Sequence, residues 1–215
     1  MALKEMVTNF KNAKLYSRMM ASLILMPIVI FLIYVGGLFF NIAMITLAVL
    51  MSYEWADMVL SDKKLRILGV FYIAIPISSM IMIRDMESGM MYISFLILTV
   101  WATDIAAYFA GILLKGPKLA PKISPKKTIS GAICALLAAS CVGIVYSWFF
   151  DFPFIKTAFC ISLFAQIGDL WESYIKRRCN VKDSSNLIPG HGGILDRMDS
   201  FILSAPFFYI MIAIA

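Results

Sequence analysis

Seven long runs of apolar residues dominate the sequence. They cover residues 19–40, 42–60, 67–83, 90–114, 128–150, 154–174 and 198–215. Each is close to the ~17–25 residues that an α-helix needs to cross the hydrocarbon core of a bilayer. Inside lipid the backbone must satisfy its own hydrogen bonds, and a helix does so within one segment. We therefore expect an all-α, polytopic bundle of about seven transmembrane helices, forming a single membrane domain over residues 1–215.

The overall composition agrees with a protein whose surface is covered by lipid. Apolar residues make up 61% of the 215 residues, above the ~45–50% of an ordinary soluble domain, and the mean hydropathy is +0.87. The first run contains no charged residue and is longer than the ~7–15-residue apolar core of a signal peptide, and no A-x-A-like cleavage site follows it. We expect this run to stay in the mature protein.

The distribution of positive charge predicts the orientation in the membrane. Seventeen of the 19 Lys and Arg residues lie in the N-terminal segment and in alternate loops on one side, and only Arg84 and Lys156 lie on the other. Lys and Arg are enriched in cytoplasmic loops. The N-terminus and the two long polar loops, 115–127 and 176–197, should therefore be cytoplasmic, and an odd number of spans places the C-terminus outside.

The sequence indicates neither binding to nucleic acid nor a structural role for the cysteines. The net charge of +6 sits in short blocks between apolar runs, where the orientation already explains it, so we expect no nucleic-acid partner. The four cysteines form no C-x-x-C pair, and three of them, Cys134, Cys141 and Cys160, lie inside apolar runs. Neither a disulfide framework nor a zinc site is predicted.

Acidic residues inside apolar runs are the first candidates for chemistry. A charge at the bilayer centre costs on the order of 3 kcal/mol, yet Asp104 and Asp169 each follow a long apolar stretch and are followed by more predicted helix. Glu54, Asp57 and Glu172 also lie in or at the cytoplasmic ends of spans. For Asp57 and Glu172, an interfacial position in contact with water is an equally good interpretation.

Asp196 and Asp199 stand at i, i+3 where the last helix is predicted to begin, so both carboxylates would project from one helical face. With Asp169 they would form a cluster of three acids, the hard-oxygen chemistry that Mg²⁺ prefers when it also binds substrate phosphates. The alternative is capping, since Asp is favoured in the first turn of a helix.

Two cytoplasmic segments have the composition of phosphate-binding loops. Residues 189–193 read Pro-Gly-His-Gly-Gly, and glycine backbone N–H groups can approach an anion closely. His191 is the single histidine, and ordering this loop is as good a role for it as proton transfer. Residues 118–127 contain four lysines, which fit either contact with anionic lipid, worth about 1 kcal/mol per Lys, or a clamp for a triphosphate.

Three blocks of the sequence follow longer patterns. The 27 residues from Ser173 to Asp199 fit S-x-I-K-R-x4-K-D-x-S-x2-I-P-x-H-G-G-I-x-D-R-x-D, Trp101 to Gly111 fit W-x-x-D-x-x-A-Y-x-x-G, and Ser124 to Gly131 fit S-P-K-K-T-x-x-G. In these blocks the sequence resembles the phosphatidate cytidylyltransferases. The resemblance covers roughly residues 101–199, whereas residues 1–100 match only in hydropathy.

The resemblance implies an enzyme of the bacterial inner membrane that makes CDP-diacylglycerol and pyrophosphate from CTP and phosphatidic acid. It places catalysis in residues 101–199, leaves 200–215 as the last helix, and allows a homodimer as well as contacts with membrane lipids. It implies Mg²⁺, with room for a second cation, at Asp169, Asp196 and Asp199, and adds Lys176 and Arg197 to the catalytic residues. The implied substrate-binding residues are Asp104, Tyr108, Ser124, Lys126, Lys127, Thr128, Lys182, Asp183, His191, Gly192 and Gly193.

Two departures from the family pattern, and two rival classes, accompany this interpretation. Ser130 stands where the family commonly has Glu, so we assign it no role, and the chain is shorter than many relatives, which have eight or nine helices. A secondary transporter would also carry acids in its spans, but it would favour inverted repeats and broken helices at the midplane rather than a charged 27-residue cytoplasmic motif. A CTP-dependent polyprenol or phytol kinase would share membrane, nucleotide and metal, and would release CDP instead of pyrophosphate.

Overall fold

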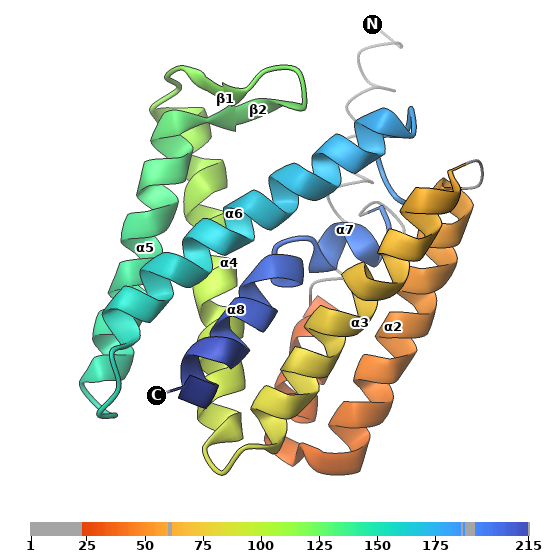
Figure 1. Cartoon of the computed structure of the whole chain (residues 1–215). Coiled ribbons are helices and arrows are strands. Elements are labelled where there is room, and N and C mark those ends of the chain that lie inside the picture. The colour runs from red at the N-terminus through yellow and green to blue at the C-terminus, as the bar shows by residue number, and fades with distance from the viewer. Residues whose placement is uncertain (1–22, 60–61, 186, 188–191, 215) are drawn as a thin grey trace, which may run out of the picture.

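The computed structural model describes residues 23–59, 62–185, 187 and 192–214. Within these residues the chain is a bundle of helices with one small hairpin (Figure 1). The labelled helices are α2 (Gly37–Met58), α3 (Lys63–Asp85), α4 (Gly89–Leu113), α5 (Ile129–Ser147), α6 (Phe154–Arg178), α7 (Leu195–Met198) and α8 (Phe201–Ile214), and another apolar helix covers Leu23–Val35. Helices α2 to α6 are long and apolar enough to cross a membrane, and Leu23–Val35 and α8 are shorter. The predicted all-α membrane fold is confirmed.

The boundary between the first two predicted spans is wrong by several residues. The sequence suggested a break near Asn41, but the first helix ends before Gly36, and α2 begins at Gly37. Gly36 and Gly37 have φ angles of 64° and 51°, in the left-handed region that favours glycine. Arg84 then donates hydrogen bonds to the carbonyls of Ile33, at 2.9 Å, and Tyr34, at 3.3 Å. These bonds satisfy carbonyls that the end of the first helix leaves free.

The helix in the last predicted span, 198–215, begins three residues later than predicted. The single turn of α7 ends at Met198, and α8 begins at Phe201. The Asp199 carboxylate accepts a hydrogen bond from the backbone N–H of Ser200 at 2.8 Å, a local bond that competes with helix continuation. Helix α6 approaches this turn closely, because a Cβ at Gly168 would lie only 2.7 Å from the Asp199 carbonyl oxygen.

The lysine-rich segment, expected as a loop, is an antiparallel hairpin of β1 (Lys118–Ala120) and β2 (Ser124–Thr128). The hairpin stands over the adjoining ends of α4 and α5 (Figure 1). Its last residue, Thr128, also caps α5, since its hydroxyl accepts a hydrogen bond from the Gly131 N–H at 3.1 Å. The hairpin is thereby fixed to the helix that follows it.

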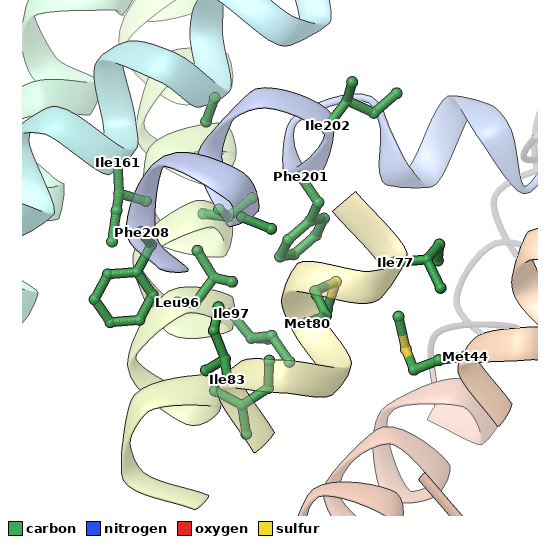
Figure 2. Close-up of a cluster of buried hydrophobic side chains, with 14 of the residues drawn as sticks. Met44, Ile77, Met80, Ile83, Leu96, Ile97, Ile161, Phe201, Ile202 and Phe208 are labelled. Atoms are coloured by element: carbon green, nitrogen blue, oxygen red, sulfur yellow. The ribbon is translucent and has the colours of Figure 1, made fainter. Parts of the chain in front are cut away.

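The core is a continuous apolar cluster shared by all the long helices. Figure 2 shows Phe208 of α8 close to Leu96 of α4, with Met80 of α3 nearby. At its centre Phe95 lies between two other rings, with centroid distances of 4.7 Å to Phe154 and 5.5 Å to Phe208. Many other large apolar side chains are exposed, as expected of helices that are apolar on all sides and face lipid.

The lysine-rich segments and the other connections lie at opposite ends of the bundle, as the charge distribution predicts. Figure 1 shows the hairpin, the C-terminal end of α6 and the adjoining ends of α2 and α3 at the same end of the molecule. The α3–α4 and α5–α6 connections lie at the other end. The lysine-rich segments that the structure describes therefore lie at the same end of the bundle.

Candidate active site

A cavity of about 660 Å³ opens at the polar end of the bundle. It lies between α4, α5, α6, the hairpin and the α7–α8 turn. Four carboxylates and four cations line it, from Asp104, Asp169, Asp196, Asp199, Lys118, Lys126, Lys127 and Arg197. Six of these residues come from the three sequence blocks, and Lys118 and Asp169 lie outside them, so the fold brings together patterns that are far apart in the chain. A cavity with both signs of charge can bind phosphate groups together with the cations that accompany them.

One ion pair in the cavity joins the hairpin to α6. Lys127 Nζ lies 2.5 Å from Asp169 Oδ2, and both side chains are about one quarter exposed, at 26% and 27%. The Ser173 hydroxyl donates a longer hydrogen bond, of 3.4 Å, to the other Asp169 oxygen. Asp169 therefore attracts a cation: Lys127 binds it in this structure, and a metal ion could take the place of the lysine.

Asp199 and Asp104 add negative charge beside Asp169. Ser200 links them, because its N–H donates to Asp199 and its hydroxyl donates to Asp104 at 3.3 Å. Burial raises the pKa of Asp199 well above its usual range, and the neighbouring carboxylates of Asp169 and Glu172 raise it further. Such a concentration of carboxylates favours the binding of a cation.

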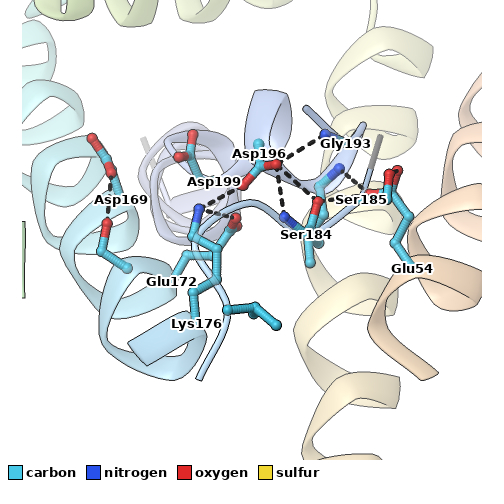
Figure 3. Close-up of polar contacts among 12 residues, drawn as sticks. Glu54, Asp169, Glu172, Lys176, Ser184, Ser185, Gly193, Asp196 and Asp199 are labelled. Atoms are coloured by element: carbon cyan, nitrogen blue, oxygen red, sulfur yellow. Dashed lines mark hydrogen bonds and ion pairs between the residues drawn. The ribbon is translucent and has the colours of Figure 1, made fainter. Parts of the chain in front are cut away.

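Asp196 belongs to a separate network of hydrogen bonds (Figure 3). Its Oδ1 lies 2.6 Å from Lys176 Nζ, and its Oδ2 accepts bonds of 2.9 Å from the N–H groups of Ser184 and Gly193. Burial would raise the pKa of Asp196, but these bonds from Lys176, Gly193 and Ser184 outweigh it and hold the pKa below its usual range. Asp196 is therefore a firmly held anion at the edge of the cavity.

Lys176 is positioned to hold this carboxylate in place. Its ammonium group bridges Asp196, at 2.6 Å, and Glu172, at 3.0 Å, and the three side chains are at most 9% exposed. The Tyr72 hydroxyl of α3 contacts the second Glu172 oxygen at 3.4 Å. Lys176, predicted as a catalytic residue, does not line the cavity, and its contacts are with carboxylates of the protein.

Of the glycine-rich segment the structure describes Gly192 and Gly193, and it places both beside Asp196. Gly192 adopts a φ of 84°, which favours glycine, and the Gly193 N–H is bonded to Asp196. The anion that this N–H binds is thus a side chain of the protein, and neither glycine lines the cavity. The prediction for His191 lies outside the described residues.

The other predicted substrate-binding residues divide into two groups. Tyr108, Lys126 and Thr128 line the cavity, together with Asp104 and Lys127. Ser124 on β2 and the exposed Lys182 and Asp183 are not among the residues that line it. Their predicted roles are not tested by the structure.

Several cavity and network residues were not assigned a role from the sequence. Gln166 and Ser200 line the cavity, and Glu54 contacts the segment that leads into α7. Gln166 stands one turn before Asp169 in an otherwise apolar run, and that polar residue was a usable signal. Glu54 was noticed as an acid in an apolar run, but its partners are more than 100 residues away in the sequence.

The described residues contain no group of three Asp, Glu, His or Cys side chains close enough to form a metal site by themselves. Mg²⁺ retains waters and commonly takes only one or two carboxylates, with substrate phosphates completing its coordination. Asp169 and Asp199, both in the cavity, have the donor chemistry for this arrangement. The residues present thus fit a Mg²⁺ ion that binds together with a phosphorylated substrate.

The fold and the cavity define a polytopic membrane enzyme whose site suits phosphate groups. The chain belongs to the cytidylyltransferase family, whose model matches residues 62–215. It is 38% identical over 213 residues to a phosphatidate cytidylyltransferase of Rickettsia bellii, which covers 94% of this chain and 92% of that protein. A protein of the same name from Rickettsia typhi is 37% identical, over 91% of this chain and 90% of its own. A third, from Brucella suis, is 41% identical over 172 residues, or 78% of this chain and 62% of its own.

Proposed function

We propose that the chain is a phosphatidate cytidylyltransferase, which converts CTP and phosphatidic acid into CDP-diacylglycerol and pyrophosphate. The observation that carries this proposal is the cavity at the polar end of the bundle, where carboxylates and cations from three sequence blocks meet. The similarity to relatives of this name along nearly the whole chain supports it.

In the reaction a phosphate oxygen of phosphatidic acid forms a bond to the α-phosphorus of CTP, and the bond from that phosphorus to the pyrophosphate oxygen breaks. Such a displacement needs alignment and neutralisation of charge more than covalent chemistry by the protein. Lys126, Lys127 and Arg197 line the cavity and are suited to neutralise phosphate oxygens. Lys127 would then exchange its contact with Asp169 for one with the nucleotide.

Mg²⁺ would be held by Asp169 and Asp199, whereas Asp196, also predicted as a ligand, is bonded to Lys176, Ser184 and Gly193. The chemistry such an ion would supply is positive charge that stabilises the negative charge developing on the nucleotide phosphates. In this arrangement the Lys176 ammonium holds Asp196 in place, and Ser200 orients Asp199 and Asp104. A second cation would have the Asp104 carboxylate available in the same cavity.

The lining of the cavity also suggests how a lipid reaches the site. Tyr108, Ile112 and Leu119 line one side of the cavity and are 65%, 54% and 37% exposed. The acyl chains of phosphatidic acid can remain in the bilayer against these apolar side chains while the headgroup reaches the carboxylates and lysines. CTP enters from the water beyond the hairpin.

The orientation follows from the same reasoning. CTP is a cytoplasmic nucleotide, and the cavity lies at the lysine-rich end of the bundle. This end therefore faces the cytoplasm, and the bundle spans the inner membrane of a bacterium. The N-terminus is then cytoplasmic and the C-terminus external. Assembly as a homodimer remains a prediction.

Purified protein in detergent, supplied with phosphatidic acid, labelled CTP and Mg²⁺, tests the proposal. We expect a CDP-diacylglycerol product and release of pyrophosphate. Release of CDP together with a phosphorylated polyprenol or phytol, when those alcohols are supplied, would identify a kinase instead.

A further inference from the structure

Glu54 on α2 is a buried carboxylate that lies ahead of the segment matched by the family model. Its side chain is 1% exposed, so the interfacial position common for acids at the ends of spans does not apply to it. Burial of a carboxylate is costly unless hydrogen bonds satisfy its oxygens. The partners of Glu54 therefore indicate why a charge is kept at this position.

Four donors satisfy the two oxygens of Glu54 (Figure 3). Oε1 accepts hydrogen bonds from the Ser185 hydroxyl at 2.6 Å and the Ile194 N–H at 2.9 Å. Oε2 accepts one from the Leu195 N–H at 2.8 Å and lies 3.0 Å from the Ser184 hydroxyl oxygen. Three of these donors belong to the segment between α6 and α7, and the fourth, Leu195, is the first residue of α7. One side chain of α2 therefore binds this segment at two places and the start of α7.

The glycine at position 193 fits against the same carboxylate. A Cβ there would lie 2.5 Å and 2.7 Å from the two Glu54 oxygens and would overlap the Ser184 hydroxyl. A side chain at this position would displace the contact. The absence of a side chain at Gly193 is therefore explained by Glu54 and Ser184.

The bound segment leads directly into the residues of the cavity. Leu195, whose N–H is bonded to Glu54, is followed by Asp196 and Arg197, which line the cavity. Ser184 adds a second connection, because its hydroxyl oxygen lies 3.0 Å from both Glu54 Oε2 and Asp196 Oδ2. Movement of Glu54 would thus be transmitted to Asp196 through the backbone and through a side chain.

We propose that Glu54 is a positioning residue of the active site, whose carboxylate holds Ser184, Ser185, Ile194 and Leu195 so that Asp196 and Arg197 face the substrates. The proposal rests on the proposed function. Among the described residues, the hydrogen bonds of Glu54 run to Ser184, Ser185 and the two N–H groups that lead into Asp196, so it acts by orientation. Partners that orient the residues of a site commonly contribute about 10–100-fold to activity.

Two substitutions at this position distinguish a role of the carboxylate as a hydrogen-bond acceptor from a role in packing alone. Glu54→Gln keeps the shape of the side chain but replaces one carboxylate oxygen by an NH₂ group, which is a donor. The two hydrogen bonds that this oxygen accepts are therefore lost. Glu54→Asp keeps the charge and shortens the side chain by one methylene. The matched control is Asp57→Asn, an exposed acid one turn further along α2.

The experiment measures amide hydrogen exchange of a peptide covering residues 192–198, together with kcat, on each purified variant in detergent. In the wild type and Asp57→Asn we expect protected amides at Ile194 and Leu195 and equal kcat. In Glu54→Gln we expect exchange of these amides to rise about tenfold, with the core helices unchanged, and kcat to fall at least about tenfold. Glu54→Asp should recover part of both.

Glu54→Gln with wild-type exchange in residues 192–198 and more than half of the wild-type kcat would overturn the proposal. If this variant does not fold, Ser185→Ala, which removes one donor from the segment, should show the same local loss of protection to a smaller extent, and unchanged exchange and kcat would count against it. A wild-type protein with protected amides but no cytidylyltransferase activity would reject the proposed function alone, since exchange still decides the role of Glu54.

Discussion

Replacing Lys176 by Met removes the cation on which the buried network depends. The ammonium group lies 2.6 Å from Asp196 and 3.0 Å from Glu172, and the three side chains are 9%, 8% and 0% exposed. Without it, two carboxylates with little access to water face each other. Removing one partner of a buried ion pair costs about 3–5 kcal/mol, because the remaining charge is uncompensated. We expect Lys176→Met to lower the free energy of unfolding by this amount.

Equilibrium unfolding in mixed detergent, followed by the loss of helical circular dichroism, measures this change. The double variant Lys176→Met/Glu172→Gln removes one of the stranded charges and should recover about 1 kcal/mol or more of the loss, as expected for contacting residues. Lys156→Met, an exposed lysine at the other end of α6, is the control and should change stability by less than about 0.5 kcal/mol. A loss below about 1 kcal/mol in Lys176→Met, with no recovery in the double variant, would refute the reasoning.

Three further predictions concern the hairpin, the glycine-rich segment and the topology. Lys127→Gln should raise the KM for CTP about tenfold in detergent free of anionic lipid, and an effect confined to anionic membranes would instead indicate lipid contact. Gly193→Ala should cost about 1–3 kcal/mol of stability by overpacking, seen as a lower unfolding temperature, and an unchanged temperature would contradict the tight fit. A reporter after Ala215 should be external and one within residues 115–127 cytoplasmic; both on one side would exclude an odd number of spans.

The helices were largely predictable because lipid imposes long apolar runs that survive in the sequence. Their ends were less predictable, since they depend on local backbone conformation. The break at Gly36 requires two left-handed residues in succession, and a Gly-Gly pair inside an apolar run does not by itself specify this. The break at residues 199–200 combines the local bond of the Asp199 carboxylate to the Ser200 N–H with the close approach of α6 at Gly168, which is a tertiary feature.

The site was predictable in its residue types and less so in its connections. The spacing of Asp196 and Asp199 suggested one helical face, but α7 is a single turn, and the two carboxylates have different partners. Asp196 is held by Lys176 and backbone N–H groups, whereas Asp199 lies with Asp169 in the more acidic part of the cavity. These long-range partners are set by how the helices pack, which no local pattern encodes.

The most direct test of the central claim follows the α-phosphate of CTP in the wild type and in Asp199→Asn. With phosphatidic acid and Mg²⁺, the wild type should move label from the α-phosphate, and none from the γ-phosphate, into a lipid product, with one pyrophosphate released per lipid formed. Asp199→Asn, shown to be folded by its unfolding temperature, should retain less than about a tenth of this rate, a barrier increase of at least about 1.4 kcal/mol. Label from the γ-phosphate in the lipid, or a folded Asp199→Asn variant with more than about a tenth of the wild-type rate, would contradict the proposed active site.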